Sequence, residues 1–171
     1  MEISYANSRI RKTRLYLDTS VVSAIDAPHK PKIELETKQF FRYVRKRADE
    51  YELLVSPVLQ EEIANCQEPK RALMQGFLEH IPTMTIEDNT EALDLANTYV
   101  QEKVLKVKHF SDLTHIAYAV VCRCDYIVSW NFEHFVNEKT MSRVNIVNRL
   151  HNYRDVIIIT PTTFIIGDHH D

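Results

Sequence analysis

The amino-acid sequence predicts an α/β fold in which a central parallel sheet of about five strands lies between layers of helices. Two observations support this prediction. Short apolar runs alternate with longer segments of helical periodicity along almost the whole chain, and prolines or short polar residues begin many of the helical segments. Strands connected through helices pair in parallel by right-handed crossovers, which bring helices to both faces of the sheet. With 171 residues, the chain is expected to form one domain over residues 1–171.

The first half of the chain is expected to contain two strands and the helices that follow them. The apolar run at residues 15–17 stops at Asp18, as a buried strand does. Ser56 is a common helix N-cap, and Pro57 fits the first turn of the helix that it begins. The predicted elements are, in order, a strand over residues 15–17, helices over 19–25 and 32–49, a strand over 53–55, and helices over 57–64 and 69–80.

The second half continues the alternation with three strands. Asp88 or Asn89 can cap one helix, and Ser111 with Asp112 can cap the next, whose many apolar residues predict that it is largely buried. Pro161 is expected to close the last strand. The predicted elements are, in order, a short strand over residues 82–86, helices over 89–103 and 113–122, a strand over 126–128, a helix over 141–153 and a strand over 156–159.

The scarcity of glycine excludes several classes of phosphate-binding site. Gly76 and Gly167 are the only glycines, whereas average usage of about 7% predicts about twelve. Neither the dinucleotide-binding nor the P-loop glycine motif can be written with them. A protein of this composition that handles phosphate must therefore use side chains or metal ions.

The cysteine and hydropathy patterns favour a cytoplasmic protein without a membrane partner. The chain has three cysteines, and an odd number without an apolar leader segment is typical of the reducing cytosol. The longest apolar runs are far shorter than the ~20 residues that a membrane-spanning helix needs.

The charge is unevenly distributed, although the formal net charge is only −3. Residues 1–50 contain 11 Lys and Arg against 7 Asp and Glu, and residues 51–171 contain 10 against 17. Such basic runs are compatible with solvated helix faces and with contacts to a phosphate backbone. The basic runs consist of Arg9, Arg11, Lys12 and Arg14, then Arg42, Arg45, Lys46 and Arg47, and finally Lys103, Lys106 and Lys108.

Acidic and amide side chains stand where the predicted strands end. Asp18 follows the first strand, Glu61 and Glu62 lie shortly after the second, Asp112 begins the helix before the fourth, and Asn131 follows the fourth. Ligands of parallel sheets bind beyond these carboxyl ends. Converging carboxylates repel one another unless a cation neutralises them, and oxygen ligands favour Mg²⁺ or Mn²⁺. This pattern suggests metal-dependent phosphodiester hydrolysis, although an acid at a strand end can also serve only as a helix cap.

Four segments, in order, resemble the motifs of PIN-domain nucleases. In the second motif of that family an acid precedes an apolar residue, so Glu62, which Ile63 follows, matches better than Glu61. A further segment, residues 159–164, resembles the final strand and tail, so the resemblance covers about residues 14–165. The four segments are residues 15–22, 56–63, 112–119 and 125–135.

The resemblance implies a three-layer α/β/α sandwich with strand order 3-2-1-4-5 and the activity of a Mg²⁺- or Mn²⁺-dependent endoribonuclease acting on RNA. Many members are the toxins of VapBC-type toxin–antitoxin pairs, which implies a small antitoxin partner and a homodimer. Asp18, Glu62 and Asp112 would be the catalytic, metal-binding acids. Asn131 would hold metal or water through its amide oxygen, and Ser20 would assist at the first motif.

The sequence leaves the roles of several residues, and the choice between alternative functions, undecided. Ser20, His115, Arg45 and Lys46 are candidate substrate contacts, although a packed or capping role is the favoured interpretation of His115. The role of His134 is similarly open. The alternative function is a non-catalytic PIN-like module that binds RNA or protein. A phosphatase with an aspartate nucleophile is disfavoured, because such enzymes need a second acid two residues after the first, where Ser20 stands.

Overall fold

The computed structural model describes residues 11–168. Its centre is a five-stranded sheet of order β3-β2-β1-β4-β5 in which every neighbouring pair is parallel. The predicted parallel sheet and its 3-2-1-4-5 order are therefore confirmed. The strands are β1 (Thr13–Leu17), β2 (Tyr51–Val55), β3 (Thr83–Thr85), β4 (Tyr126–Val128) and β5 (Ile157–Ile159).

The strand order reverses between β1 and β4. The chain moves outward from β1 through β2 to β3, and then crosses to the other side of β1 to form β4 and β5. The register pairs Leu15 with Leu53 of β2 and with Tyr126 of β4. The carboxyl ends of β1 and β4 therefore lie side by side at the reversal point, where parallel sheets commonly bind ligands.

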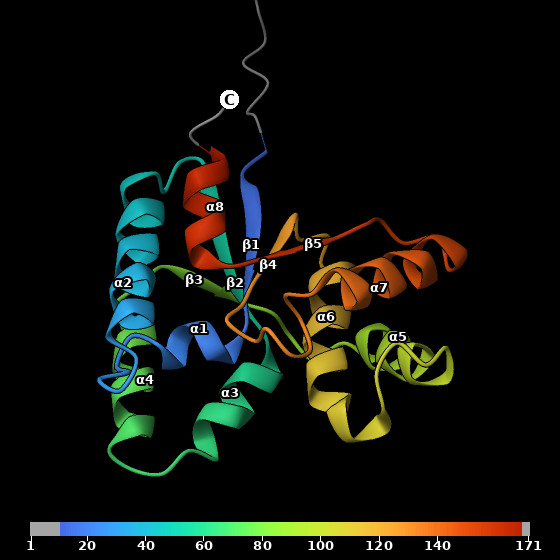
Figure 1. The fold of residues 1–171 in the computed structure, drawn as a ribbon, viewed down its shortest axis with the longest axis horizontal. Helices are drawn as coiled ribbons and strands as arrows, with labels where there is room; N and C mark the ends of the chain where they lie inside the picture. The colour runs from blue at the N-terminus through green and yellow to red at the C-terminus, as the bar shows by residue number, and fades with distance from the viewer. Residues whose placement is uncertain (1–10, 169–171) are drawn as a thin grey trace, which may run out of the picture.

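Helices cover both faces of the sheet, as Figure 1 shows. The side chains of β1 alternate between the faces, with Tyr16 packed against α5, α6 and α7 and with Leu15 and Leu17 packed toward α1, α2 and α8. The three-layer sandwich is thus confirmed. The helical elements are α1 (Thr19–Ser23), α2 (Pro31–Lys46), α3 (Pro57–Ala64), α4 (Lys70–Glu79), α5 (Thr90–Gln101), the 3-10 turn η1 (Val107–His109), α6 (Phe110–Val121), α7 (Glu138–Leu150) and α8 (Pro161–Asp168).

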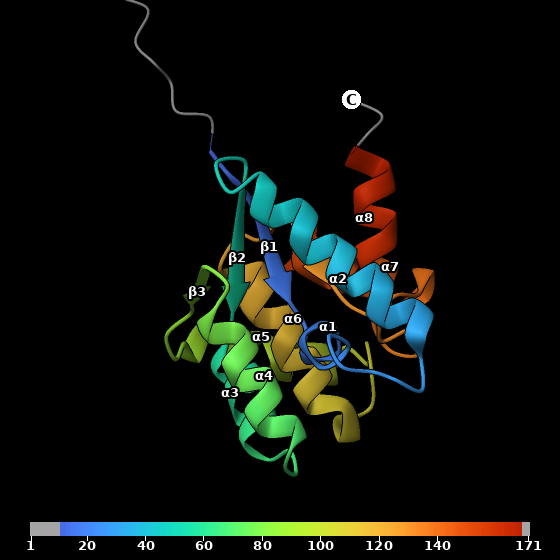
Figure 2. The same ribbon diagram turned by 90° about the vertical axis from the view of Figure 1, so that its left-hand side faces the viewer.

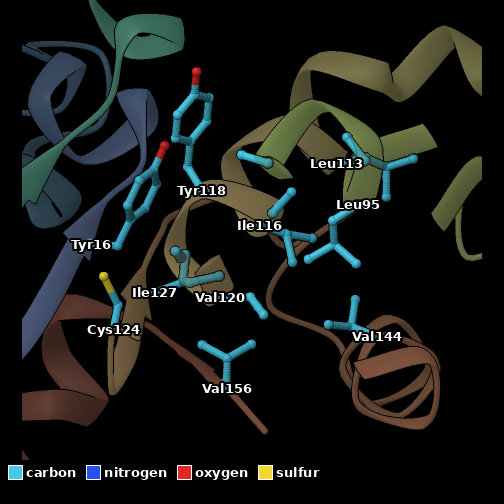
Figure 3. Packing of buried hydrophobic residues seen from close by; sticks show 14 of the residues in the cluster. Tyr16, Leu95, Leu113, Ile116, Tyr118, Val120, Cys124, Ile127, Val144 and Val156 are labelled. Carbon is cyan, nitrogen blue, oxygen red and sulfur yellow. The ribbon is translucent and has the colours of Figure 1, made fainter. Parts of the chain in front are cut away.

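Helix α6 is the most deeply buried helix of one layer. Figure 3 shows Leu113 and Ile116 of α6 in one buried cluster with Leu95 of α5 and Val144 of α7. Leu113, Ile116 and Ile127 of β4 are fully buried. The burial predicted for this helix is confirmed, and it fixes the position of the first turn of α6 at the edge of the sheet.

Helix α8 is absent from the sequence prediction. Pro161 does not simply close the last strand, because it begins a helix whose Thr163 N–H donates to Oγ1 of Thr160, 3.1 Å away. Phe164 of α8 is 4% exposed and packs against the aromatic rings of α2 and β2. The Thr-Pro pair at 160–161 is the same N-cap and proline signal that was recognised at Ser56 and Pro57.

The boundaries of the other elements differ from the prediction by at most three residues, and those of α3 and β4 match it. Strands β1 and β2 begin at Thr13 and Tyr51, because backbone pairing continues into the polar residues before each apolar run. Helix α7 begins at Glu138 after Asn137, whose side chain caps it by accepting from Thr140 N. No helix within residues 11–168 combines the length and the apolar character needed to cross a membrane.

Candidate metal centre

The three predicted acids and the amide meet at the carboxyl edge of the sheet. Asp18 directly follows β1, Asn131 lies in the loop after β4, Glu62 lies in α3 after β2, and Asp112 lies in the first turn of α6. The Asp18 N–H donates to the carbonyl of Val128 at 3.1 Å, which joins the ends of β1 and β4. The fold thus brings together residues that are more than a hundred positions apart in the sequence.

Asp18 is held by hydroxyl groups and does not cap the helix that it precedes. It occupies the N-cap position of α1 but makes no side-chain capping hydrogen bond. Its Oδ2 instead accepts from the hydroxyls of Ser20 and Ser129, the latter at 2.8 Å. The carboxylate is 5% exposed. The interpretation of Asp18 as a simple helix cap is therefore wrong.

The same two serines join the loops after β1 and β4. Ser20 Oγ accepts from the N–H of Trp130, and Ser129 Oγ accepts from the N–H of Asn131, both at 2.9 Å. Ser20, a predicted site residue, therefore acts on Asp18 directly. Ser129, which is fully buried, was not singled out from the sequence; its position between the strand and Asn131 in the fourth motif was the available signal.

Glu62 is the acid of α3 that turns into this cluster, whereas its neighbour Glu61 is exposed. The Oε2 of Glu62 lies 3.1 Å from Nε2 of His115, and Oε1 accepts from the Ser111 hydroxyl. Partial burial raises the pKa of Glu62, but hydrogen bonding to His115 and its charge, with help from the Ser111 and Thr19 hydroxyls, lower the pKa to about 2. Glu62 is therefore ionised at any working pH.

His115 lies behind the carboxylates rather than at the surface. Its side chain is 1% exposed, and Nδ1 lies 2.6 Å from the Tyr16 hydroxyl, which lies 2.6 Å from Oγ of Ser56. Burial lowers the pKa of His115, but the hydrogen bond with Glu62 and the charges of Asp18, Glu62 and Asp112 raise it above its ordinary value. So little exposed surface leaves a substrate almost nothing to contact, and the packed role is the one that the contacts describe.

Asp112 is the carboxylate whose charge is least compensated. Burial raises its pKa, and the charge of Asp18 raises it further, against the lowering effect of nearby His134 and His109. The Asn131 Nδ2 group lies 3.4 Å from Oδ1 of Asp112. A cation beside Asp112 and Asp18 would relieve this repulsion.

The amide of Asn131 is oriented differently from the expectation. Its oxygen accepts from the N–H of His134 at 3.0 Å, and its NH₂ group faces Asp112. The reason is chemical: an ionised carboxylate only accepts hydrogen bonds, so the amide presents its donor to Asp112 and its acceptor to the backbone. The predicted ligand oxygen is engaged within its own loop.

Arg45 and Lys46 are not brought to this cluster. They lie in the last turn of α2, which runs back toward the amino ends of the strands (Figure 2). Arg45 lies beside Tyr51, the first residue of β2, at the opposite edge of the sheet from the acids. Of the first predicted basic run, Arg9 lies outside the described residues.

A cavity with several basic residues in its wall, called here the basic cavity, lies beside the cluster. A hollow of about 920 Å³ lies between the α5–α6 connection and the start of α7, with His109 and His134 in its wall. His109 Nδ1 lies 3.5 Å from Oδ2 of Asp112, so one residue of the cavity wall contacts an acid of the cluster. His109 was not singled out from the sequence. The charged lining residues are Lys103, Lys106, Lys108, Glu133, Lys139 and Arg143.

Comparison with known proteins places the fold. No protein-family model matches the chain, and no curated protein matches it. The crystal structure of VapBC2 from Rickettsia felis, bound to a DNA fragment from their promoter, contains a chain that aligns with a TM-score of 0.56. The alignment covers 86% of this chain and 98% of that chain at 12% identity. A likeness at this identity concerns architecture, and together with the strand order it shows a PIN-like fold.

Proposed function

We propose that this protein is a Mg²⁺- or Mn²⁺-dependent endoribonuclease. The observation that carries the proposal is the convergence of Asp18, Glu62 and Asp112 from three separate elements at the point where the strand order reverses. Asp18 has no capping role that would otherwise explain its burial. The PIN-like fold and the motif resemblance support the same proposed function.

The residues of the cluster fit a hard divalent cation. All three side chains offer carboxylate oxygens, the donors that Mg²⁺ prefers, and His115 compensates Glu62 but leaves the pKa of Asp112 raised. Asp18, Glu62 and Asp112 would therefore hold the ion. Such an ion, when bound, activates water and stabilises negative charge on a phosphodiester.

The surrounding residues keep the ligands oriented. Ser20 and Ser129 donate to the same oxygen of Asp18, and His115 with Ser111 fixes both oxygens of Glu62. The Asn131 NH₂ group fixes one oxygen of Asp112. These contacts fix the orientation of the three carboxylates that would hold the ion.

The basic cavity supports a nucleic-acid substrate. Four lysines and one arginine line it against one acid, Glu133. Clustered cations bind a phosphate backbone without regard to sequence, and two residues of the cavity wall, His109 and His134, lie beside Asp112. RNA rather than DNA is proposed from the family resemblance.

A small antitoxin is the proposed protein partner, and a homodimer the proposed assembly. The similar fold occurs in VapBC2, and a second hollow of about 490 Å³ lies beside Ser20, with Trp130 and Phe132 in its wall. An antitoxin segment seated there could place an Arg against the acids. The free thiols of Cys66, Cys122 and Cys124 are consistent with the cytoplasm as the proposed location.

Neighbouring glutamates on α3 provide the test. We expect Glu62→Gln to lower Mn²⁺-dependent cleavage of single-stranded RNA at least ~100-fold, whereas exposed Glu61→Gln keeps activity within about twofold of the unchanged protein. Circular dichroism would show that both variants stay folded. Equal activity in both variants, or a folded protein that binds RNA without cleaving it, would overturn the proposal; the second result would identify a non-catalytic binding module.

A further inference from the structure

Two histidines, His109 and His134, lie beside Asp112. One donor atom from each of His109, Asp112 and His134 lies within 4.8 Å of the others. The geometry points to a second metal site, formed by two imidazoles and one carboxylate, that binds a borderline transition ion of the Zn²⁺ class. This inference stands on the positions of the three side chains and does not depend on nuclease activity.

The separation between His109 and Asp112 suits direct coordination. Nδ1 of His109 lies 3.5 Å from Oδ2 of Asp112, and ligand atoms in a tetrahedral zinc site, with bonds of about 2.1 Å, lie about 3.4 Å apart. The His109 and His134 rings lie with centroids 3.9 Å apart. The three side chains are each about one fifth exposed, so an ion can reach them from solvent.

The backbone holds the three residues in place. His109 ends η1 and Asp112 follows one helical turn later in α6, so both side chains lie on the same side of the helix start. The loop that carries His134 is closed by Asn131, whose carbonyl accepts from Phe135 N at 3.0 Å and whose amide oxygen accepts from His134 N. The fully buried Phe135 anchors this loop. The backbone of all three residues is therefore held in place, and ion binding would require the two imidazole side chains to turn toward a common point.

The donor set distinguishes this site from the carboxylate cluster. Imidazole nitrogen suits Zn²⁺, Ni²⁺ and Cu²⁺, whereas Mg²⁺ prefers oxygen alone. The two oxygens of Asp112 face different neighbours, Oδ1 toward Asn131 and Oδ2 toward His109. Oδ2 of Asp112 is therefore the oxygen that this second site would use.

The basic cavity suggests what completes the coordination. Three protein ligands leave a fourth position open, as in zinc sites that bind water or a substrate oxygen, and both histidines lie in the cavity wall. An oxygen of a phosphate group in the cavity is the ligand class that fits. Lys106 and Lys108 in the same wall weaken cation binding, so we expect an affinity below that of closed structural zinc sites.

Zn²⁺ titration of the tag-free, metal-free protein against a chromophoric chelator, with excess Mg²⁺ present, tests the inference. We expect one Zn²⁺ to bind, and His109→Gln and His134→Gln each to weaken binding at least ~10-fold. Exposed His151→Gln and the double variant His169→Gln/His170→Gln control for adventitious binding by histidine. Visible absorption of Co²⁺ bound in place of Zn²⁺ should change in the first two variants alone.

Two results would overturn the inference. One is unchanged Zn²⁺ affinity in folded His109→Gln and His134→Gln proteins. The other is complete displacement of Zn²⁺ by Mg²⁺. Because these measurements use no RNA, failure of the zinc site and failure of the proposed nuclease activity are separately recognisable.

Discussion

The Nε2 atom of His115 lies 3.1 Å from Oε2 of Glu62. The same nitrogen lies 3.9 Å from Oδ1 of Asp18, so one buried imidazole stands between two carboxylates of the candidate metal centre. The raised pKa of His115 favours its cationic form there. The chain thus supplies part of the positive charge that balances its acid cluster. Asp112 is the acid whose negative charge stays least balanced, and its pKa is raised.

Removing this imidazole should change the titration of Glu62. In the metal-free protein we expect His115→Gln to raise the pKa of Glu62 from about 2 toward or above the ordinary 4.5, because burial then acts without the compensating charge. NMR of the side-chain carboxyl carbons measures this pKa directly.

The dependence of the free energy of unfolding on pH should change in the His115→Gln variant as well. The Glu62 contribution is present above about pH 4.5 and is lost as the pH falls toward 2. The His115 contribution is complete below about pH 6.5 and is lost as the pH rises through its raised pKa. A Glu62 pKa that stays near 2 in the variant would contradict the assigned cause.

Adding a fourth carboxylate should strengthen metal binding and weaken the metal-free protein. Asn131→Asp keeps an acceptor for His134 N but replaces the NH₂ group that faces Asp112 by a negative charge. We expect a lower melting temperature in EDTA and a larger stabilisation by Mn²⁺, with affinity increased about 10-fold or more. Asn89→Asp, at the N-cap of α5, is the matched change away from the acids. Equal Mn²⁺ stabilisation of Asn131→Asp and the unchanged protein would contradict the prediction.

Charge reversal separates the two candidate RNA-contacting surfaces. Lys106→Glu/Lys139→Glu in the basic cavity and Arg45→Glu/Lys46→Glu on α2 change the net charge by the same amount. We expect the cavity pair to weaken single-stranded RNA binding about 10-fold or more and to reduce the salt-dependence slope by about 0.7 per lost contact. The α2 pair should stay within about twofold, because it lies at the opposite edge of the sheet. Fluorescence anisotropy at several salt concentrations measures the RNA affinity and its salt dependence for both double variants. A larger loss of affinity in the α2 pair than in the cavity pair would support the substrate contact first predicted for Arg45 and Lys46.

Helix α8 should contribute substantially to stability through Phe164. Its ring lies 5.4 to 5.8 Å, centroid to centroid, from those of Phe40, Tyr51 and Tyr126. Phe164→Ala should lower the free energy of unfolding by about 3–5 kcal/mol, because it leaves a cavity in a buried cluster. Exposed Ile166→Ala in the same helix should change it by less than about 0.5 kcal/mol. Urea denaturation compares them, and equal midpoints would show that α8 does not pack as described.

The sequence was sufficient to predict the sheet and which acids lie together at its carboxyl edge. Apolar runs that stop at a polar residue located the ends of β1 and β4, and the parallel arrangement then required Asp18 and Asn131 to be neighbours. The sequence could not predict how the side chains of the site are oriented. Whether the Asn131 amide presents oxygen or nitrogen to Asp112 depends on His134 N, which is a tertiary contact within a loop.

The remaining differences also arise from long-range packing. The pairing of His109 with His134 joins residues from η1 and from the loop after β4, which no local pattern connects. Arg45 and Lys46 form a basic run beside a helix face, but only the direction of α2 relative to the sheet decides which edge they reach. Helix α8 differs, because its Thr160-Pro161 start was visible in the sequence.

The most direct test of the metal-centre proposal is RNA cleavage by Asp18→Asn and Asp112→Asn proteins, assayed with Mg²⁺ or Mn²⁺ and with EDTA, beside exposed Asp94→Asn as the matched control. We expect the unchanged protein and Asp94→Asn to cleave RNA only when metal is present. Asp18→Asn and Asp112→Asn should lose at least ~100-fold in rate while circular dichroism shows them folded. Full activity in both of these variants would contradict the assignment of the carboxylate cluster as the catalytic centre.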